Sequence, residues 1–497
     1  MPSRLLLLSS AIGLVVAAPV AAETAARQDT VYVYGTAGAY AENDSRSSTK
    51  TDTPLVDIPQ SVTVITRDLI DDQSMSSMGD LVRYIPGVTM GQGEDHRDAP
   101  TFRGNSTTAN FFVDGVRDDL QYLRDLYTVD RVDVLKGPSA LAFGRGAGGG
   151  TINRVTKKAD GERVRDLTVS VGSFDHARGA LDIGDSVSDT VGLRANAMYE
   201  NSGSYRDGVS VERLGFAPTA TFELAPTTSL SLVAEHFGDE RTVDRGVPSD
   251  GGTPFSGSEK AFFGNPDINE SDIEVNTLTA VLDHAFTDTL TLRSSLSYGD
   301  YDKFYQNTYA ATPLSAVGTV EIAAYNSGTK RENIFSQTDL VWKTSSGDIA
   351  HTLLAGIEFG QQVTDNTRFS GSFPEAGGAS RLVTSVADRG QTSTPVFTDL
   401  SRDNTNDLSL FAIYAQDQIE LTERLQVIAG VRYDQFDLDY QGRLGTDFSR
   451  TDDFVSPRVG AVFSATDAVT LYAGWSQSYL PQSGDQFSSL DASTAAL

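Results

Sequence analysis

Phe111-Phe112-Val113-Asp114-Gly115-Val116-Arg117-Asp118 stands at the centre of a segment, residues 103–157, that predicts how this chain folds. Short apolar runs in this segment alternate with charged turns and glycines, which leaves no room for a long helix. The other runs are Arg103-Gly104-Asn105, Val132-Asp133-Val134-Leu135-Lys136-Gly137-Pro138-Ser139 and Phe143-Gly144-Arg145-Gly146-Ala147-Gly148-Gly149-Gly150-Thr151-Ile152-Asn153. The pattern predicts a small, tightly turned sheet.

The glycines of the last run formally match a dinucleotide-binding motif, Gly144-x-Gly146-x-x-Gly149. Such a motif binds a pyrophosphate only where it opens a helix inside a βαβ unit. Here the β-branched residues of Thr151–Thr156 follow, and they predict a strand. We therefore interpret the glycines as residues that permit positive φ angles and a close approach between neighbouring backbone segments, and we exclude a nucleotide site.

The same order of segments resembles the plug domain of TonB-dependent outer-membrane siderophore receptors. The strand-like run Ile58–Ile65 and a short helix near Met78–Gly87, stopped by its proline, resemble that domain as well. We therefore expect residues 52–160 to form the plug. In its motifs, Glu94–Asn105 followed by Phe111–Asp118, the chain is most similar to receptors for catecholate-type siderophores.

The chain begins with the features of a secretory signal peptide. A basic start at Arg4 precedes the apolar run Leu5–Ala18, and small residues up to Ala22 precede the acidic Glu23. The run is too short to span a bilayer, so we expect residues 1–22 to be the signal peptide and the mature protein to leave the cytoplasm. The absence of cysteine excludes disulfides, and the net charge of −28 argues against nucleic acid as a partner.

Residues 23–51 are rich in alanine, threonine, serine and charge, and we expect them to form a mobile periplasmic tail. Within this tail, Asp29-Thr30-Val31-Tyr32-Val33 has high strand propensity and no partner nearby in the sequence. One interpretation is an incidental edge strand. The other, implied by the resemblance, is a TonB box, a short extended segment that adds a strand to a sheet of TonB.

After about residue 161 the apolar residues recur with a period of two. One face of a predicted strand carries Leu290, Leu292, Leu296 and Tyr298, and one face of another carries Leu425, Val427, Ala429, Val431 and Tyr433. This alternation, with aromatic residues at many strand ends, is typical of a transmembrane β-barrel, and a soluble β-sandwich is the alternative. We expect roughly 13 such strands in residues 161–497. Long loops are predicted over Arg241–Asp272, Gln306–Arg331 and Asp365–Asp407.

The resemblance implies a transmembrane β-barrel of about 22 antiparallel strands around a small N-terminal α+β plug in the lumen. The sequence supplies only roughly 13 of these strands and ends at Leu497 without a terminal aromatic strand. An unclosed sheet in lipid would expose unpaired backbone groups. We therefore expect a C-terminally incomplete barrel, either a fragment or a truncated gene product that would not transport.

The chain carries no recognisable catalytic pattern. Its five histidines are scattered, and neither an H-E-x-x-H nor a G-x-S-x-G motif occurs. We therefore predict that the protein is not an enzyme, binds no metal directly and holds no permanent cofactor.

By resemblance, Gly91–Asn105 and Asp118–Tyr122 lie at the extracellular apex of the plug. The candidate ligand-binding residues there are His96, Arg97, Arg117, Gln121 and Tyr122. Guanidinium donors and aromatic rings suit a bulky, anionic ferric complex through charge-assisted hydrogen bonds and cation–π contacts. The alternatives are that the histidine is a solvated loop residue and that the two arginines merely pair with neighbouring aspartates.

Arg103 and Lys136 match positions at which family plugs present cations to acidic residues of the barrel wall, and we expect them to latch the plug. The resemblance implies an outer-membrane transporter that binds a ferric siderophore outside and passes it inward with energy from TonB. The alternatives are a TonB-dependent receptor for haem, cobalamin or a glycan, and an outer-membrane binding protein without transport.

Overall fold

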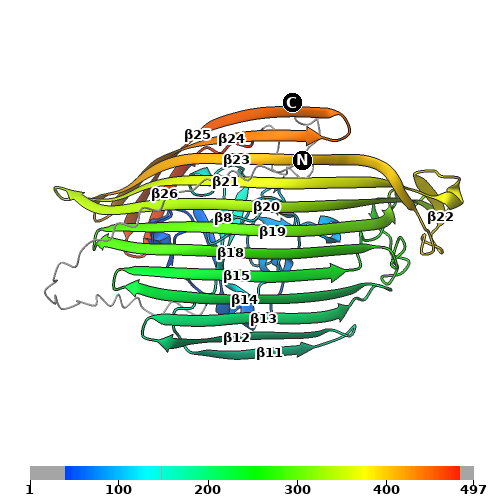
Figure 1. The fold of residues 1–497 in the computed structure, drawn as a ribbon, viewed down its shortest axis with the longest axis horizontal. Coiled ribbons are helices and arrows are strands. Elements are labelled where there is room, and N and C mark those ends of the chain that lie inside the picture. The colour runs from blue at the N-terminus through cyan, green and yellow to red at the C-terminus, as the bar shows by residue number, and fades with distance from the viewer. Residues whose placement is uncertain (1–39, 147, 482–497) are drawn as a thin grey trace, which may run out of the picture. The chain divides into compact units, whose positions relative to one another are not determined.

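The computed structural model describes residues 40–146 and 148–481. In these residues two parts follow each other along the chain, a small domain of short elements and a large antiparallel sheet. Figure 1 shows the long strands stacked in chain order from β11 to β25, with the N-terminal elements, in blue and cyan, behind them. The predicted signal peptide, residues 1–22, and the predicted TonB box, Asp29–Val33, lie outside the described residues.

The small domain, which we call the plug, is built on a five-stranded sheet in the order β3-β9-β10-β7-β8. Strand β9 pairs antiparallel with β3 and β10, and β10 pairs in parallel with β7. The strands of the plug are β1 (Asp44–Ser45), β2 (Thr53–Pro54), β3 (Ser61–Thr66), β4 (Val88–Met90), β5 (Pro100–Phe102), β6 (Asn105–Ser106), β7 (Phe111–Val113), β8 (Val116–Arg117), β9 (Val129–Lys136) and β10 (Gly150–Thr156). Its helices are α1 (Arg67–Asp72), α2 (Met78–Val82) and α3 (Ala140–Phe143), with short 3-10 turns η1 (Leu55–Asp57) and η2 (Gly93–Asp95). Among the described residues no helix has the length and apolar character needed to cross a membrane.

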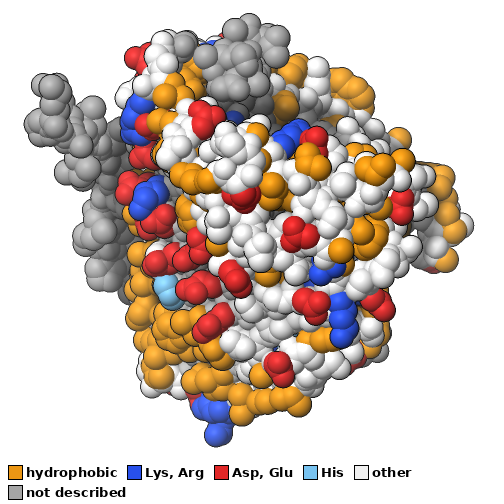
Figure 2. Space-filling model, turned by 90° about the vertical axis from the view of Figure 1, so that its right-hand side faces the viewer, with side chains coloured by type: hydrophobic (Ala, Val, Ile, Leu, Met, Phe, Trp, Pro, Cys, Tyr) orange, Lys and Arg blue, Asp and Glu red, His pale blue; other side chains and the backbone are white. Residues whose placement is uncertain are grey.

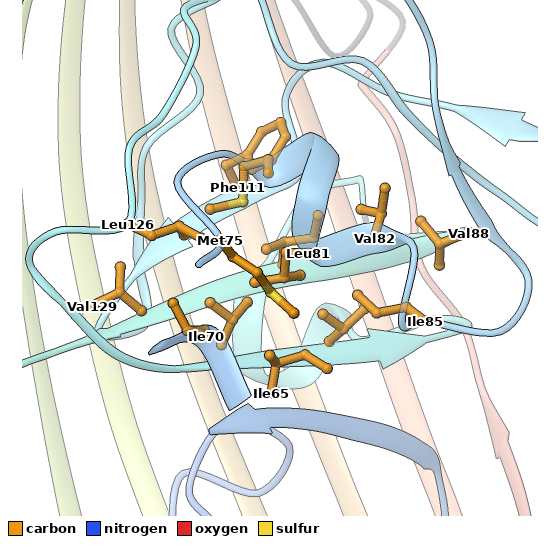
Figure 3. Packing of buried hydrophobic residues seen from close by; sticks show 14 of the residues in the cluster. Ile65, Ile70, Met75, Leu81, Val82, Ile85, Val88, Phe111, Leu126 and Val129 are labelled. Atoms are coloured by element: carbon orange, nitrogen blue, oxygen red, sulfur yellow. The ribbon is translucent and has the colours of Figure 1, made fainter. Parts of the chain in front are cut away.

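The apolar core of the plug lies between this sheet and the helices α1 and α2. Ile65 of β3, Ile70 of α1 and Leu81 of α2 meet there, and each is at most 2% exposed (Figure 3). Burying an aliphatic side chain of this size contributes about 1.5–3 kcal/mol. Helix α2 ends at Val82, earlier than predicted, because the residues before Pro86 form tighter turns that suit the position ahead of a proline.

The glycines after α3 have the backbone role predicted for them. Gly144 and Gly146 have φ angles of 69° and 76°, which other residues rarely adopt. A Cβ atom at Gly150 would lie 2.5 Å from the ring of Phe102 and 2.6 Å from the carbonyl oxygen of Leu135. Only glycine allows these backbones to approach so closely, and β10, not a helix, follows.

In the described residues the large sheet holds thirteen strands that pair one after another and a further strand, β22, that pairs with β20. Its first strands are β11 (Val164–Val171), β12 (Ala177–Ser188), β13 (Val191–Gly203), β14 (Ser210–Ala225), β15 (Thr228–Arg241), β18 (Glu270–Thr287) and β19 (Leu290–Ala310). The others are β20 (Thr319–Ser346), β21 (Ile349–Ser372), β22 (Arg381–Ser385), β23 (Val396–Thr422), β24 (Leu425–Gly442), β25 (Thr446–Thr466) and β26 (Val469–Ser476). The sheet therefore has as many consecutive strands as the sequence predicts.

Successive side chains along these strands point to opposite faces. On β19, Leu296 and Tyr298 are 54% and 43% exposed, whereas Ser297 between them is 9% exposed. On β24, Val431 is 46% exposed and the neighbouring Arg432 is fully buried. One face of the sheet is therefore apolar and exposed and the other is polar and covered, which is the alternation of a transmembrane β-barrel.

The covered face of the sheet, which we call the wall, surrounds the plug. Arg178 of β12 pairs with Asp125 of the plug, and Arg458 of β25 donates to the carbonyl oxygen of Ser48 ahead of β3. These two strands lie near opposite ends of the strand order. The sheet must therefore curve around the small domain.

The predicted loops are partly strand. Of Gln306–Arg331 only residues 311–318 are irregular, because β19 and β20 extend into it. Strands β21 and β23 likewise take both ends of Asp365–Asp407. Arg241–Asp272 is irregular over residues 242–269, apart from the short pair β16 (Ser249–Asp250) and β17 (Thr253–Pro254). Polar residues form the hydrogen bonds between strands as well as apolar residues do. The strands therefore extend beyond the alternating apolar residues from which they are predicted.

Figure 2 looks onto the end of the sheet that carries β22 and these irregular segments. Polar atoms and carboxylates are spread over that end, and hydrophobic side chains gather along one flank. Below the surface, Phe263, Ile322 and Phe373 from three different segments are buried in one apolar cluster. The irregular segments are thus joined to one another by a small core of their own.

Residues 44–54, which we call the strap, are packed against both the plug and the wall. The Ser47 hydroxyl donates to Asp133 of β9 at 2.6 Å, and Gln416 of β23 donates to the Thr49 carbonyl at 3.1 Å. The sequence instead assigns residues up to 51 to a mobile tail. The difference arises because the hydroxyl groups that make this stretch look hydrophilic find buried polar partners.

Candidate functional site

The apex of the plug is the loop of residues 91–99 between β4 and β5. The φ angles of its 3-10 turn η2 are 62° at Gly93, 57° at Glu94 and 59° at Asp95. A non-glycine residue in this left-handed region costs on the order of 1–3 kcal/mol unless its surroundings hold it there. Both carboxylates of the turn are held by the wall.

Glu94 binds several groups at once, His96 of its own loop among them. Tyr325 of β20 donates a hydrogen bond of 2.5 Å to Oε2, Arg245 pairs with Oε1 at 3.2 Å and Arg97 pairs with Oε2 at 3.2 Å. Burial raises the pKa of Glu94, but the hydrogen bond with His96 and the charge of Arg245 outweigh burial and hold that pKa well below its usual 4.5. Glu94 is therefore a carboxylate at neutral pH and supplies one negative charge to the two arginines that it pairs with.

Asp95 contacts the wall on the other side of the turn. Its Oδ2 accepts a hydrogen bond of 2.9 Å from the backbone N–H of Asp244, and Arg241 of β15 lies 3.9 Å from Oδ1. Burial dominates here and raises the pKa of Asp95 to about 6, against the opposing charge of Arg241. The surroundings of one turn thus lower the pKa of Glu94 and raise the pKa of Asp95.

Tyrosines and arginines from the sheet side surround this turn. Arg368 of β21 stacks on the ring of Tyr325 at 3.7 Å, and Arg245 stacks on Tyr309 at 4.1 Å. Tyr305 packs against Tyr325 with 5.5 Å between ring centres. The apex cluster, as we call this set, consists of Glu94, Arg97, Arg245, Tyr305, Tyr309, Tyr325 and Arg368. Such rings and guanidinium groups suit an anionic or aromatic ligand through charge and stacking.

His96 is buried beneath the turn, where only 7% of it is exposed. Its Nδ1 lies 2.5 Å from Nζ of Lys303 on β19, and its ring centre lies 3.9 Å from that of Tyr305. Burial, and then the charge of Lys303, lower the pKa of His96 well below 6.5. The ring is therefore neutral at pH 7 and its Nδ1 accepts a hydrogen bond from the lysine, so His96 is not the solvated loop residue of the alternative interpretation.

A second plug segment, residues 118–125, folds around Arg124, whose side chain is fully buried. Its guanidinium donates to Asp118 Oδ2 at 2.8 Å and to the Leu120 carbonyl at 2.8 Å, and it stacks on the ring of Tyr122 at 4.2 Å. The Tyr122 hydroxyl donates to the same Asp118 oxygen at 2.9 Å. The backbone N–H of Arg124 also donates to Asp98 at 3.0 Å, which joins this segment to the apex loop.

The structure brings four of the five predicted ligand residues together. His96 and Arg97 lie in the apex loop just after its turn, and Gln121 and Tyr122 lie in the adjoining segment. Arg117 lines a pocket with Tyr122, but its guanidinium is buried and donates to the carbonyls of Ala109, Phe143 and Arg145 at 2.6–3.1 Å. It fastens one plug loop to another, and Arg97 pairs with Glu94 instead of an aspartate.

The predicted latch residues lie close to each other at a different place. Lys136 donates to the Thr63 hydroxyl at 3.2 Å and to the Pro86 carbonyl at 3.4 Å. Burial, and then the nearby charge of Arg103, lower the pKa of Lys136. Within the described residues neither cation is recorded in an ion pair with a wall carboxylate. The latch stays a prediction.

Two plug carboxylates that were not predicted from the sequence, and not the predicted latch cations, are recorded in ion pairs with the wall. Asp119 pairs with Arg331 of β20 at 2.7 Å and with Arg145 of the plug at 2.6 Å. Asp125 pairs with Arg178 of β12 at 2.8 Å and with Arg213 of β14 at 3.1 Å. The signs are inverted relative to the predicted latch, with acids on the plug and cations on the wall. Asp119 falls in the predicted apex segment Asp118–Tyr122 and Asp125 lies just beyond it, and the wall partners of both are too distant in the chain for a pattern to reveal.

Both parts of the chain match known protein families. Residues 54–151 match the family model described as TonB-dependent Receptor Plug Domain, and residues 215–496 match the one described as TonB dependent receptor-like, beta-barrel. The metal-pseudopaline receptor CntO of Pseudomonas aeruginosa is 31% identical over 465 residues, which cover 90% of this chain. The chain spans 64% of the length of that receptor. The catecholate siderophore receptor Fiu of Escherichia coli is 26% identical, over 95% of this chain and 68% of its own length.

Solved structures show the same fold. The closed form of Fiu has a TM-score of 0.80 at 24% sequence identity, over 91% of this chain and 70% of that one. The siderophore receptor PiuA from Acinetobacter baumannii has a TM-score of 0.77 at 24% identity, over 89% and 68% of the two chains. The predicted architecture of a plug and an antiparallel barrel sheet is thus confirmed. Because the barrel model covers more than half of the chain, this protein belongs to the TonB-dependent receptors, a family of outer-membrane β-barrel receptors and not of enzymes.

Proposed function

We propose that this protein acts as an outer-membrane receptor that binds a ferric siderophore and passes it inward with energy supplied through TonB. The observation that carries the proposal is the apex cluster, where three tyrosines and three arginines meet a single glutamate at the tip of the plug. Ferric siderophore complexes are bulky, often anionic and frequently aromatic at the rim, so guanidinium and phenol groups suit them. No permanent cofactor is part of the proposal, because the iron travels as its siderophore complex.

A growth assay tests the substrate class. The complete protein is produced in an iron-starved strain that lacks its own siderophore receptors, and a panel of ferric siderophores is offered as the sole iron source. We expect a ferric catecholate to restore growth. Restoration by haem, and by no ferric siderophore, would sink the proposal in favour of another bulky nutrient, and competition assays with cobalamin and glycans extend the same comparison.

Coupling to TonB is assigned to Asp29-Thr30-Val31-Tyr32-Val33, and export to the signal peptide of residues 1–22. An extended segment of this kind gains main-chain hydrogen bonds by adding a strand to its partner. Deleting residues 29–33 from the complete protein should abolish uptake and leave ligand binding unchanged. If binding is lost with uptake, the segment belongs to the receptor fold and the assignment fails. The N-terminal sequence of the mature protein should begin at Glu23.

A second candidate substrate is a complex of pseudopaline type with a metal other than iron. It is favoured by the 31% identity to a metal-pseudopaline receptor, which exceeds the 26% identity to the catecholate receptor. The two candidates differ in metal dependence. If the nickel or zinc complex of one chelator binds as tightly as its iron complex, the pseudopaline-type candidate replaces the ferric one.

A further inference from the structure

Lys303 is a cation of the wall that is turned toward the plug. It lies on β19 between Asp302 and Phe304, both of which point to the outer face, and only 6% of Lys303 is exposed. A lysine ammonium is strongly hydrated in water, so burying one needs a full set of acceptors. The identity of these acceptors shows what the residue does.

The Lys303 ammonium contacts both plug segments that form the apex region. Nζ lies 2.5 Å from Nδ1 of His96 and 3.3 Å from the carbonyl oxygen of the same residue. It also donates to the carbonyl oxygen of Gln121 in the second segment. The Lys303 amino group thus meets three acceptor atoms, all of them on the plug.

These acceptors are neutral. No carboxylate lies within ion-pair distance of Lys303 among the described residues, and His96 is an uncharged imidazole at pH 7. An ion pair between plug and wall, such as that of Asp119 with Arg331, holds a plug residue by its side chain. Lys303 instead binds two backbone carbonyls, so it fixes the course of the main chain in both segments.

The other contacts that reach the apex from the wall and from the irregular segment 242–269 hold one segment each. Tyr325 and Arg245 bind Glu94 in the first segment, and Arg331 binds Asp119 in the second. Among the residues that the structure describes, Lys303 is the wall side chain with recorded hydrogen bonds to both. The two segments also bond directly to each other through Asp98, and Lys303 adds the link that ties both of them to the wall.

We propose that Lys303 is a positioning residue that holds residues 92–99 and 118–124 in fixed relation and thereby sets the affinity of the apex for its ligand. The inference rests on the proposed function, because it concerns the same site. Lys303 acts through His96 and Gln121 and lies beneath the turn that would meet the ligand. Its loss should loosen both segments together while the plug core keeps its structure.

Hydrogen exchange of the ligand-free protein tests the positioning role directly. The test variant is Lys303→Met, which keeps the length of the side chain and removes its charge and donors. The control is Lys330→Met on the neighbouring strand β20, because Lys330 points outward and pairs with Asp302 at 2.6 Å. We expect exchange in residues 92–99 and 118–124 to rise at least tenfold in Lys303→Met and to stay unchanged in Lys330→Met, with β9 protected in both.

Two results would overturn the proposal. One is an increase in only one of the two segments or in neither. The other is a uniform increase that includes β9, which would make Lys303 a general stabiliser of the plug. If the methionine variant does not assemble, Lys303→Gln, which keeps one polar donor group, carries the same test with the same expected pattern.

Ligand binding then separates this inference from the proposed function. With ferric tris(2,3-dihydroxybenzoate) as the probe, Lys303→Met should bind at least tenfold more weakly than the wild type and Lys330→Met equally well. Equal binding by the wild type and Lys303→Met would refute the positioning role. Failure of the wild type to bind any ferric complex would instead refute the proposed substrate and leave the exchange result standing.

Discussion

At the level of single residues, the plug is held by buried carboxylates that form ion pairs with arginines of the wall. Asp119 is 1% exposed and accepts from Arg331, Arg145 and Gln362. Burial raises the pKa of Asp119, but the charges of Arg331 and Arg145 outweigh burial and lower it to about 2. Asp119 contributes to stability because a buried arginine without a counter-charge is costly, and Asp119 supplies that charge to Arg331 and Arg145.

Asp119→Asn should therefore weaken the hold of the wall on the plug. The substitution keeps the shape of the side chain but leaves two buried arginines short of one negative charge, a loss of roughly 3–5 kcal/mol. Hydrogen exchange in plug strands β7 and β10 should become faster by the amount that this loss of stability predicts. Asp44→Asn, which changes an exposed carboxylate, is the control. A loss below about 1 kcal/mol would contradict this role.

Asp98 makes the stability of the plug depend on pH in the opposite sense. It is 3% exposed, and burial raises its pKa to about 6 from the usual 3.8, although Arg124 partly opposes the shift. The folded state thus keeps a proton on Asp98 up to about pH 6, while the unfolded chain releases it near pH 4. The free energy of unfolding should fall as pH rises through this window, by at most about 3 kcal/mol from this group.

Asp98→Asn should remove this dependence, because the amide oxygen still accepts from the Arg124 backbone and never ionises. Calorimetric melting of the plug between pH 4.5 and pH 7.5 measures it. The wild type should melt progressively lower across the window and the variant should change less. Parallel curves for the two proteins would show that Asp98 is not the titrating group. Asp119 acts in a separate window, since its stabilising effect is lost only below about pH 4.

At the level of elements, the strap connects the N-terminal tail to the plug and the wall. Asp133 of β9 is fully buried and accepts from Ser45 at 2.7 Å and from Ser47 at 2.6 Å. Ser47→Ala removes one donor from a buried carboxylate and should cost about 1–3 kcal/mol. Proteolysis within residues 44–54 should become faster, whereas Ser106→Ala, at an exposed hydroxyl, should leave it unchanged. Equal cleavage of both variants would show that the strap does not depend on this bond.

The elements differ in how far the sequence predicts them. The plug segments and the alternating strands follow from periodicity and turn residues, because those signals are local. Helix α2 and the strands beyond the apolar band are misjudged, since backbone pairing continues where the apolar pattern stops. Four of the predicted ligand residues, His96, Arg97, Gln121 and Tyr122, lie close together, and their part in ligand binding stays a prediction. Its wall residues, Lys303 among them, escape prediction because pairing across the lumen leaves no trace in local sequence.

At the level of the whole molecule, the exposed apolar face should lie against lipid. Leu296 of β19 is 54% exposed in the apolar part of this face, whereas Phe304 of the same strand lies among carboxylates near the irregular segments. Leu296→Arg should cost roughly 2–4 kcal/mol in a bilayer and Phe304→Arg about 0–1 kcal/mol. Unfolding in lipid vesicles by denaturant measures both. Equal costs would contradict this orientation of the sheet.

The central claim is that the apex cluster of this receptor binds a ferric siderophore. Its most direct test is equilibrium binding of a radiolabelled ferric catecholate to outer membranes that contain the wild type, Arg368→Met, Tyr309→Ala or the outward-facing control Tyr298→Ala. We predict saturable binding to the wild type and the control, and at least tenfold weaker binding to both apex variants. Wild-type membranes that bind no ferric complex, or apex variants that bind as well as the control, would contradict the claim.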